Sequence, residues 1–392
     1  MARPIVSQLK DAAQVEHLRA HNKAALDCVA PVPVELSVIV PTFNERDNVP
    51  LLVERLKKVL AGIAWEVIFV DDNSSDGTAQ VVLDEAAHNP RVRRILRIGR
   101  RGLSGATVEG MLGSTATYVA VMDGDLQHDE TLLPRMLKAL RASDADLVVG
   151  SRYVKGGSAE SFGRGRLAIS QVSGAIARRL LKVDLADPMS GFFMMRQDRL
   201  QALAPRLSAQ GFKILLDIAA TARGSLRVLE LPYTFGTRLR GESKLSSIVA
   251  LDFLGLLVAK LSGDLIPVRF FLFSLVGALG VGVHLAALYA GLKTFSMPFS
   301  SAQGFATLVA MTSNFMLNNR LTYRDQRLKG AAFVRGLMGF YLICGVGFLA
   351  NVGVASWLYG LKQTWWVAGI TGAVMGTIWN YAMSSAIVWK AK

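Results

Sequence analysis

The chain has 392 residues, of which 51% are hydrophobic and 19% are charged, and this composition excludes an intrinsically disordered protein. Its two cysteines, Cys28 and Cys344, exclude a disulfide scaffold and a four-cysteine zinc site. The mean hydropathy of +0.34 indicates a membrane part, and the net charge of +14 indicates an anionic partner such as a phosphorylated substrate or an acidic lipid surface.

In chain order, residues 1–34 are predicted to form a polar extension, and a soluble α/β domain is predicted over residues 35–243. Short β-branched runs alternate there with amphipathic segments, and this pattern predicts parallel βαβ units. The expected strands are 36–41, 66–71, 93–98, 118–122 and 146–150. The expected helices are 46–61, 78–88, 104–116, 129–142 and 166–182.

Residues 244–266 are strongly apolar and are predicted to form a linker of interfacial helices at the membrane surface. The helix expected at 166–182 has the same character, because Arg178 and Arg179 lie near its end opposite apolar positions. For both segments the alternative is a helix buried in the core of the soluble domain.

Residues 267–392 are predicted to form an all-α transmembrane domain. Its four apolar runs each approach the ~20 residues that cross a bilayer. The runs are 270–292, 300–319, 336–359 and 366–389. Ten Lys or Arg residues and one acid occur in this region, and eight of these cations flank the ends that would share a side with the soluble domain. The positive-inside rule then places the soluble domain on the cytoplasmic side of a multi-pass cell-membrane protein.

Polar residues follow four of the predicted strands, where an open α/β sheet binds its ligands. The segments are Pro41-Thr42-Phe43-Asn44-Glu45, Asp71-Asp72, Asp123-Gly124-Asp125-Leu126-Gln127-His128 and Gly150-Ser151-Arg152-Tyr153. Because the carboxyl ends of parallel strands share one edge of the sheet, we expect these segments to meet there.

Asp123 and Asp125 are two residues apart in a turn that leaves a buried strand, so both carboxylates are expected to point to one side. Hard oxygen ligands of this kind suit Mg²⁺ or Mn²⁺ bridging to a diphosphate, and Gln127 would supply a further oxygen. The alternative for an isolated Asp-X-Asp is a solvated surface turn.

Asp72 is placed to accept hydrogen bonds from a nucleobase or ribose. The segment 99–113 contains several glycines but no Gly-X-Gly-X-X-Gly motif, so Arg100, Arg101 and residues 102–105 are interpreted as a loop and not as a phosphate cradle.

Together these motifs resemble the family 2 glycosyltransferases with a GT-A fold, and in particular the dolichol-phosphate mannose synthases. The resemblance covers roughly residues 35–260. It also rests on Asp-Pro-Met-Ser-Gly-Phe at 187–192 and Thr-Arg-Leu-Arg-Gly-Glu-Ser-Lys-Leu at 237–245. The four-span region resembles the GtrA-like membrane domain. The expected fold is therefore a Rossmann-like GT-A domain followed by an all-α four-helix transmembrane domain.

The resemblance implies roles for individual residues. The nucleotide would be held by Pro41, Phe43, Glu45, Val70 and Asp72. The sugar nucleotide would contact Asp123, Gly124 and Asp125, with the metal on Asp125 and Gln127. Arg152, Arg238 and Lys244 would face the donor diphosphate and the acceptor phosphate, and with Asp123 and Asp125 they complete the predicted catalytic set.

The resemblance implies inverting transfer of mannose from GDP-mannose to dolichyl or polyprenyl phosphate, which gives a β-linked product. The alternatives are a hexosyltransferase that uses a UDP-sugar, such as UDP-glucose, and translocation of the glycolipid by the membrane domain. Nucleic-acid binding is poorly supported and is not expected, because much of the positive charge flanks the spans and the sequence has no stacking motif. The sequence does not decide whether the protein forms a homo-oligomer.

Overall fold

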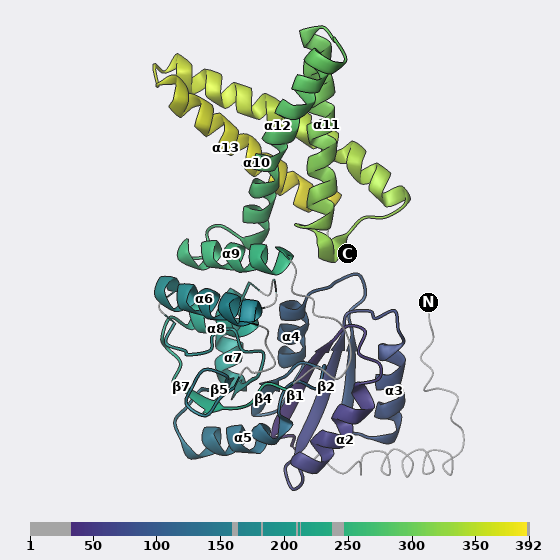
Figure 1. The fold of residues 1–392 in the computed structure, drawn as a ribbon, viewed down its shortest axis with the longest axis vertical. Helices are drawn as coiled ribbons and strands as arrows, with labels where there is room; N and C mark the ends of the chain where they lie inside the picture. The colour runs from purple at the N-terminus through teal and green to yellow at the C-terminus, as the bar shows by residue number, and fades with distance from the viewer. Residues whose placement is uncertain are drawn as a thin grey trace, which may run out of the picture.

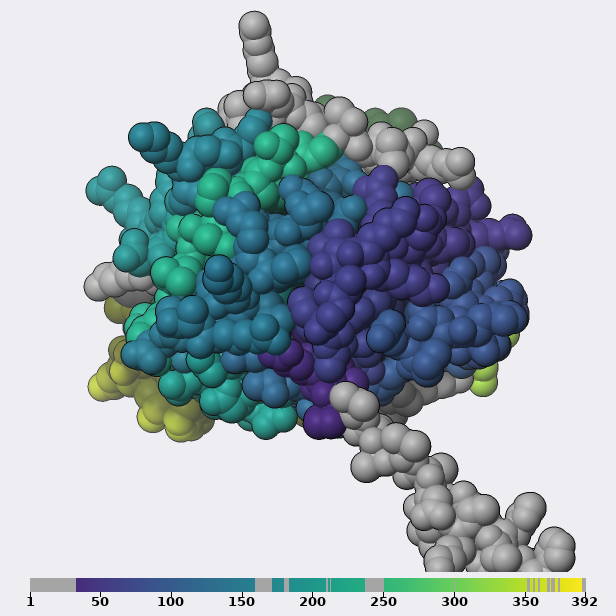
Figure 2. All heavy atoms as spheres, turned by 90° about the horizontal axis from the view of Figure 1, so that it is seen from below, coloured from purple at the N-terminus to yellow at the C-terminus, as the bar shows by residue number. Residues whose placement is uncertain are grey.

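The computed structural model describes residues 33–158, 164–181, 183–208, 211, 213–236 and 247–389. The predicted extension at 1–34 therefore lies almost wholly outside the described residues. An α/β domain forms the lower part of the molecule in Figure 1, and four long helices rise above it. Figure 2, viewed from the end opposite to these helices, is filled mainly by atoms of the α/β domain.

A single sheet of seven strands organises the α/β domain, in the order β3-β2-β1-β4-β6-β5-β7. Its strands are β1 (Leu36–Thr42), β2 (Trp65–Asp71), β3 (Val92–Leu96), β4 (Tyr118–Val121), β5 (Leu147–Ser151), β6 (Phe193–Arg196) and β7 (Val228–Pro232). The five strands expected from the sequence are confirmed to within two residues at each end. β6 and β7 were not expected. β6 pairs antiparallel with both β4 and β5, so the sheet is mixed and contains one strand that runs against the expected parallel βαβ units.

Helices cover both faces of this sheet. They are α2 (Val49–Val59), α3 (Thr78–His88), α4 (Leu103–Leu112), α5 (Leu133–Ala142), α6 (Arg164–Leu181), α7 (Gln197–Leu203) and α8 (Ile214–Ala222), with short 3₁₀ turns η2 (Glu130–Leu132) and η3 (Ala204–Arg206). The five helices expected here correspond to α2 to α6, and α7 and α8 are additional.

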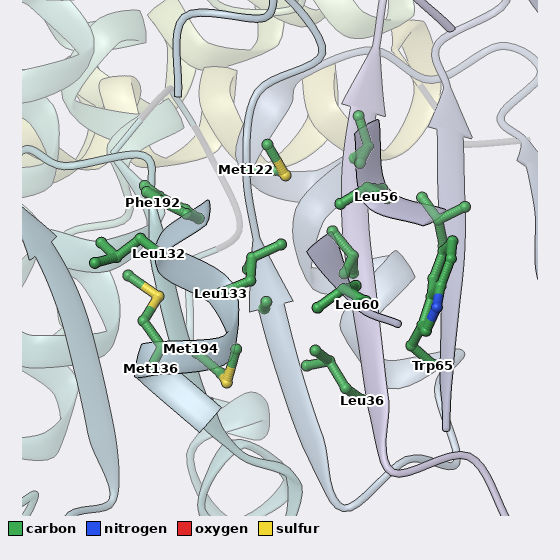
Figure 3. Close-up of a cluster of buried hydrophobic side chains, with 14 of the residues drawn as sticks. Leu36, Leu56, Leu60, Trp65, Met122, Leu132, Leu133, Met136, Phe192 and Met194 are labelled. Atoms are coloured by element: carbon green, nitrogen blue, oxygen red, sulfur yellow. The ribbon is translucent and has the colours of Figure 1, made fainter. Parts of the chain in front are cut away.

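Each central strand is buried on both faces, as its continuous apolar sequence predicts. Side chains alternate along a strand, so Val38 and Val40 join one core cluster and Ile39 joins the other. Figure 3 shows part of the first cluster, in which Leu56 from α2 and Met136 from α5 lie over the sheet.

On the opposite face α4 approaches the sheet closely. A Cβ at Gly110 would lie 2.5 Å from Ile39 Cγ2 and 2.7 Å from Val70 Cγ2, so only glycine fits at this contact. This close packing fixes the position of the loop that precedes α4, which belongs to the edge described below.

Helix α9 (Ser247–Leu261) lies across the top of the α/β domain, beneath the long helices (Figure 1). Lys260 of α9 binds Asp217 of α8, with 2.9 Å between Nζ and Oδ1, and both side chains are buried. Asp252 of α9 binds Arg324 through two hydrogen bonds of 3.0 and 2.6 Å. The apolar linker expected at 244–266 is thus mainly a helix between the two parts of the protein.

The upper part consists of two helical hairpins. They are formed by α10 (Val268–Tyr289) with α11 (Phe299–Arg320) and by α12 (Ala331–Gly360) with α13 (Trp365–Met383), together with the π-helical turns η4 (Ala290–Thr294) and η6 (Ser384–Val388) and the 3₁₀ turn η5 (Arg324–Gln326). These helices correspond to the four expected spans, although α12 begins five residues earlier than expected.

Among the described residues, two helical stretches are long and apolar enough to cross a bilayer. They are Val268–Thr294 and Ala331–Ala350, and only 22% of the most apolar window of each is buried inside the protein. A core helix of a soluble protein would be mostly buried, so both are better suited to a lipid environment. Four spans remain a prediction.

Candidate active site

The carboxyl ends of β1, β2 and β4 point towards α9 and the long helices (Figure 1). At this edge Asp71 ties β1 to the turn after β2. It accepts hydrogen bonds from the Thr42 hydroxyl at 3.2 Å, from the Ser74 backbone N–H at 2.9 Å and from the Ser74 hydroxyl at 2.6 Å. Asp71 is fully buried, so its role is to hold the edge together.

Asp72 fastens the loop after β3 to the end of β2. Its carboxylate forms an ion pair with Arg97 and accepts a 2.6 Å hydrogen bond from the backbone N–H of Gly102. Burial raises the pKa of Asp72, although the Gly102 N–H and Arg97 favour its ionised form. Gly102 has a φ of 139°, a conformation that suits glycine and brings this N–H to the carboxylate.

The same loop contacts the first motif. The Arg101 guanidinium lies 4.6 Å from the centroid of the Phe43 ring, a cation–π arrangement. The segment interpreted as a loop and not as a phosphate cradle therefore contacts both Phe43 and Asp72, two residues predicted to hold the nucleotide. The signal in the sequence was an arginine-rich, glycine-rich stretch directly after a strand.

The other predicted nucleotide residues differ in their surroundings. The Glu45 carboxylate accepts a 2.7 Å hydrogen bond from Asn48 and lies next to Gly124, where a Cβ would be 3.8 Å from Glu45 Cγ. Pro41 lies buried in β1. Val70 is fully buried in the core that faces α4, so only its backbone is available at the edge.

Asp123 is the more open of the two acids after β4, with 37% of its side chain exposed. Its Oδ2 lies 3.3 Å from His128 Nε2, and His128 Nδ1 lies 3.2 Å from the Tyr233 hydroxyl. The imidazole is packed among the rings of Phe192, Tyr233 and Phe235, with centroids 5.1 to 5.8 Å away. His128 is thus a buried support for Asp123.

Asp125 is buried in a tight turn. Its Oδ1 accepts a 3.1 Å hydrogen bond from the Gln127 backbone N–H, and Leu126 between them has a left-handed φ of 62°. The Gln127 side-chain amide donates to the Gly236 carbonyl at 2.9 Å, and the Gly236 N–H donates to the Gln127 carbonyl at 2.8 Å. This pairing fixes the turn to the segment that follows β7.

The donor set fits a divalent cation that takes its other ligands from a substrate. Within the described ranges, no three His, Cys, Asp or Glu side chains gather into a complete metal cage. Mg²⁺ is usually bound by one or two carboxylates together with phosphate oxygens and water. Asp123 and Asp125 supply hard oxygens of this kind at one edge of the sheet.

Arg152 forms a buried, bidentate ion pair with Asp187. Its Nε and Nη2 donate to the two carboxylate oxygens at 2.7 and 2.8 Å, and its backbone N–H donates at 3.1 Å. Burial alone would lower the pKa of Arg152, but the Asp187 carboxylate outweighs it and the pKa is raised. Asp187 belongs to a motif quoted above without a role, and it positions Arg152.

Two predicted site residues, Arg238 and Lys244, lie outside the described residues. The structure therefore brings together the ends of β1, β2 and β4 and the loop after β3. Arg152 joins them through Phe235, whose ring centroid lies 5.7 Å from the guanidinium carbon and which also packs on His128.

A cavity of about 540 Å³ opens between this edge and the long helices. Arg97, Arg100 and Arg101 line it from the loop after β3, and Arg269 and Arg324 line it from the helical part. Apolar Val268 and Leu272 of α10 complete the opposite wall. The loop after β3 is therefore next to the long helices, across a space lined by five arginines and by the acids Glu109, Asp252 and Asp325.

The comparison with known proteins agrees with this architecture. Residues 37–203 match glycosyl transferase family 2, and residues 272–389 match the GtrA/DPMS transmembrane domain. The chain is 32% identical over 358 residues to a dolichol-phosphate mannosyltransferase of Pyrococcus furiosus, across 91% of this chain and 99% of that protein.

Two further relatives match the catalytic part. A dolichol-phosphate mannosyltransferase of Saccharomyces cerevisiae is 38% identical over 234 residues, which cover 56% of this chain and 85% of the yeast protein. An undecaprenyl-phosphate mannosyltransferase of Micrococcus luteus is 36% identical over 213 residues, which cover 53% and 86%. The chain therefore belongs to the dolichol-phosphate mannosyltransferase family and is a family 2 glycosyltransferase with a GT-A domain and a GtrA-type membrane domain.

Proposed function

We propose that the protein transfers mannose from GDP-mannose to dolichyl or polyprenyl phosphate at the cytoplasmic face of the cell membrane. The observation that carries the proposal is that Asp72 follows β2 and that Asp123 and Asp125 follow β4, two strands whose carboxyl ends point towards the long helices (Figure 1). The names of the relatives, which act on dolichol phosphate or undecaprenyl phosphate, support a lipid-phosphate acceptor.

The donor nucleotide would lie over the ends of β1 and β2. Phe43 and Arg101 would border the base, and the Asp72–Arg97–Gly102 contacts would keep the adjoining loop in place. The diphosphate would then extend towards β4, where Asp123 and Asp125 lie. Bound there, Mg²⁺ or Mn²⁺ would neutralise charge on the departing nucleotide.

Transfer to a phosphate needs no general base in the protein. A phosphomonoester has a second pKa of about 6, so it is largely a dianion at pH 7 and is already a nucleophile. One of its oxygens forms the bond to the anomeric carbon, while the bond from that carbon to the diphosphate breaks and its electron pair leaves with the nucleotide. His128 is buried beside Tyr233, which accords with a supporting role and not with proton transfer.

A donor screen tests this proposal. The purified full-length protein is incubated with a short polyprenyl phosphate, Mg²⁺ or Mn²⁺, and either GDP-mannose or UDP-glucose. We expect a β-linked mannosyl phosphate lipid from GDP-mannose and no product from UDP-glucose. Product formed only with UDP-glucose would refute the mannose assignment. Equal activity with EDTA in place of metal would refute the requirement for a divalent cation.

A further inference from the structure

A second cavity lies at the end of α11 that is nearest the catalytic domain. Its volume is about 330 Å³, and all of its lining residues come from α11, the start of α12 and the loop between them. Three cations line it, Arg320, Arg327 and Lys329, and its apolar wall includes Met316 and Phe333. Among the described residues, none from the GT-A domain or from α9 lines it, so this cavity is separate from the candidate active site as described above.

The loop that forms the cavity is held in place by Asn319, which is buried. Its amide donates to the Leu328 carbonyl at 3.1 Å, and its carbonyl oxygen accepts from the Leu328 N–H at 2.8 Å and from Trp389 Nε1 at 3.1 Å. The Trp389 ring in turn stacks on Tyr323, with centroids 4.2 Å apart. Arg327 and Lys329 flank Leu328, so these contacts set their positions.

The three cations differ from their neighbours in charge pairing. Arg324 is paired with Asp252 and Arg269 with Asp325. Arg320, Arg327 and Lys329 are exposed, and no carboxylate pairs with them within the part of the chain that the structure describes. The described residues that line the cavity include three cations and no acid, so the cavity carries a concentrated positive charge that a bound anion would neutralise.

The apolar wall narrows the class of anion. Met316 is 46% exposed and lies on α11 about one helical turn before Arg320. A ligand with a phosphate group attached to hydrocarbon contacts both the cations and the apolar wall, whereas a free phosphate contacts only the cations. Basic pockets between membrane helices on the cytoplasmic side bind anionic lipid headgroups by this combination.

We propose that this cavity binds the headgroup of an anionic glycerophospholipid from the leaflet next to the catalytic domain. Arg320, Arg327 and Lys329 contact the phosphate, and Met316 and Phe333 contact the start of the acyl chains. The acceptor lipid of the transfer reaction is not the occupant, because its phosphate must reach Asp123 and Asp125 and no residue near those acids lines this cavity.

Lipid binding to the full-length protein tests the proposal. The protein is placed in phosphatidylcholine nanodiscs with increasing amounts of phosphatidylglycerol, and bound phosphatidylglycerol is counted by native mass spectrometry. Because each cation close to the bound phosphate contributes about 1 kcal/mol, the double variant Arg327→Gln/Lys329→Gln should bind phosphatidylglycerol about 30-fold more weakly. The pair Arg327→Lys/Lys329→Arg should restore binding.

Arg335→Gln is the matched control. Arg335 is an exposed arginine near the start of α12, and it does not line the cavity. The Arg335 charge does not contact a headgroup in the cavity and is screened by salt, so this variant should change binding by less than about twofold. An equal loss in Arg335→Gln would mean that the attraction is diffuse surface charge and would overturn the proposal, as would unchanged binding in the double variant.

Two competition experiments test whether the cavity prefers a phospholipid headgroup, free phosphate or the acceptor lipid. Inorganic phosphate at millimolar concentration should not displace phosphatidylglycerol. Displacement would mean that the cavity binds phosphate alone and would refute a lipid site. Polyprenyl phosphate should displace it no better than phosphatidylglycerol itself does. Preferential displacement that disappears in the double variant would assign the cavity to the acceptor and refute our choice of lipid.

The double variant should keep its mannosyl-transfer rate, which also shows that it is folded.

Discussion

The acids after β2 and the acids after β4 lie on one edge of the sheet but have different surroundings. Asp71 is fully buried, and the Asp72 side chain is 9% exposed and is held by Arg97 and Gly102. The Asp123 side chain, by contrast, is 37% exposed and faces the open side of the turn. Asp125 is as buried as Asp72, so the difference lies in Asp123: Asp71 and Asp72 organise loops, whereas Asp123 is the acid whose oxygens are accessible at this edge.

The largest expected effect follows from removal of an acid after β4. Asp125→Ala should lower kcat by about 1,000-fold, or about 4 kcal/mol, because the leaving diphosphate loses its metal-bound neutralisation. Mannosyl transfer to a polyprenyl phosphate is the measurement. Circular dichroism should be unchanged, and normal turnover would remove Asp125 from the metal site.

The next effect concerns stability. Asp187→Asn leaves the Arg152 guanidinium buried without its counter-ion, which costs about 3 kcal/mol of unfolding free energy. Thermal unfolding in detergent should show a clearly lower midpoint. Glu54→Gln, which breaks the exposed pair with Lys58, is the control and should leave the midpoint unchanged. If the two variants melted alike, the Arg152–Asp187 pair would have no structural role.

A smaller effect is expected at Asp72. Asp72→Asn loosens the loop after β3, so the KM for GDP-mannose should rise about 10-fold while kcat changes little. Burial raises the pKa of Asp72, so this carboxylate takes up a proton at a higher pH than an ordinary carboxyl group does. As the pH is lowered, the wild-type KM should therefore begin to rise at a pH above the usual range of carboxyl pKa values. That part of the pH dependence should be absent in the variant, and a loss in kcat alone would instead place Asp72 in the chemical step.

The smallest effect is expected where α9 meets the helical part. Burial raises the pKa of Asp252 in spite of Arg324, so desolvation offsets much of the attraction between them. Asp252→Asn and Arg324→Gln should each lower stability by about 1 kcal/mol. Thermal unfolding of both single variants and the double variant measures the coupling, and fully additive losses would mean that the two residues act independently.

Much of the fold is predictable because its signals are local. Continuous apolar runs mark β1, β2 and β4, and runs of about 20 apolar residues mark the long helices. β6 is only four residues long and was missed, and its antiparallel direction depends on the chain returning between β4 and β5. A short strand of this kind has no local signal for its direction.

The sequence by itself determined which residues lie at the ends of β1, β2 and β4, because the strand pattern and the motifs after each strand are contiguous in the chain. Only the tertiary structure decided their partners. Arg97 reaches Asp72 across 25 residues, and Arg152 reaches Asp187 across 35. Such pairs form only after the sheet has brought distant segments together, since ionic and hydrogen-bond partners are selected by distance in space and not by separation along the chain.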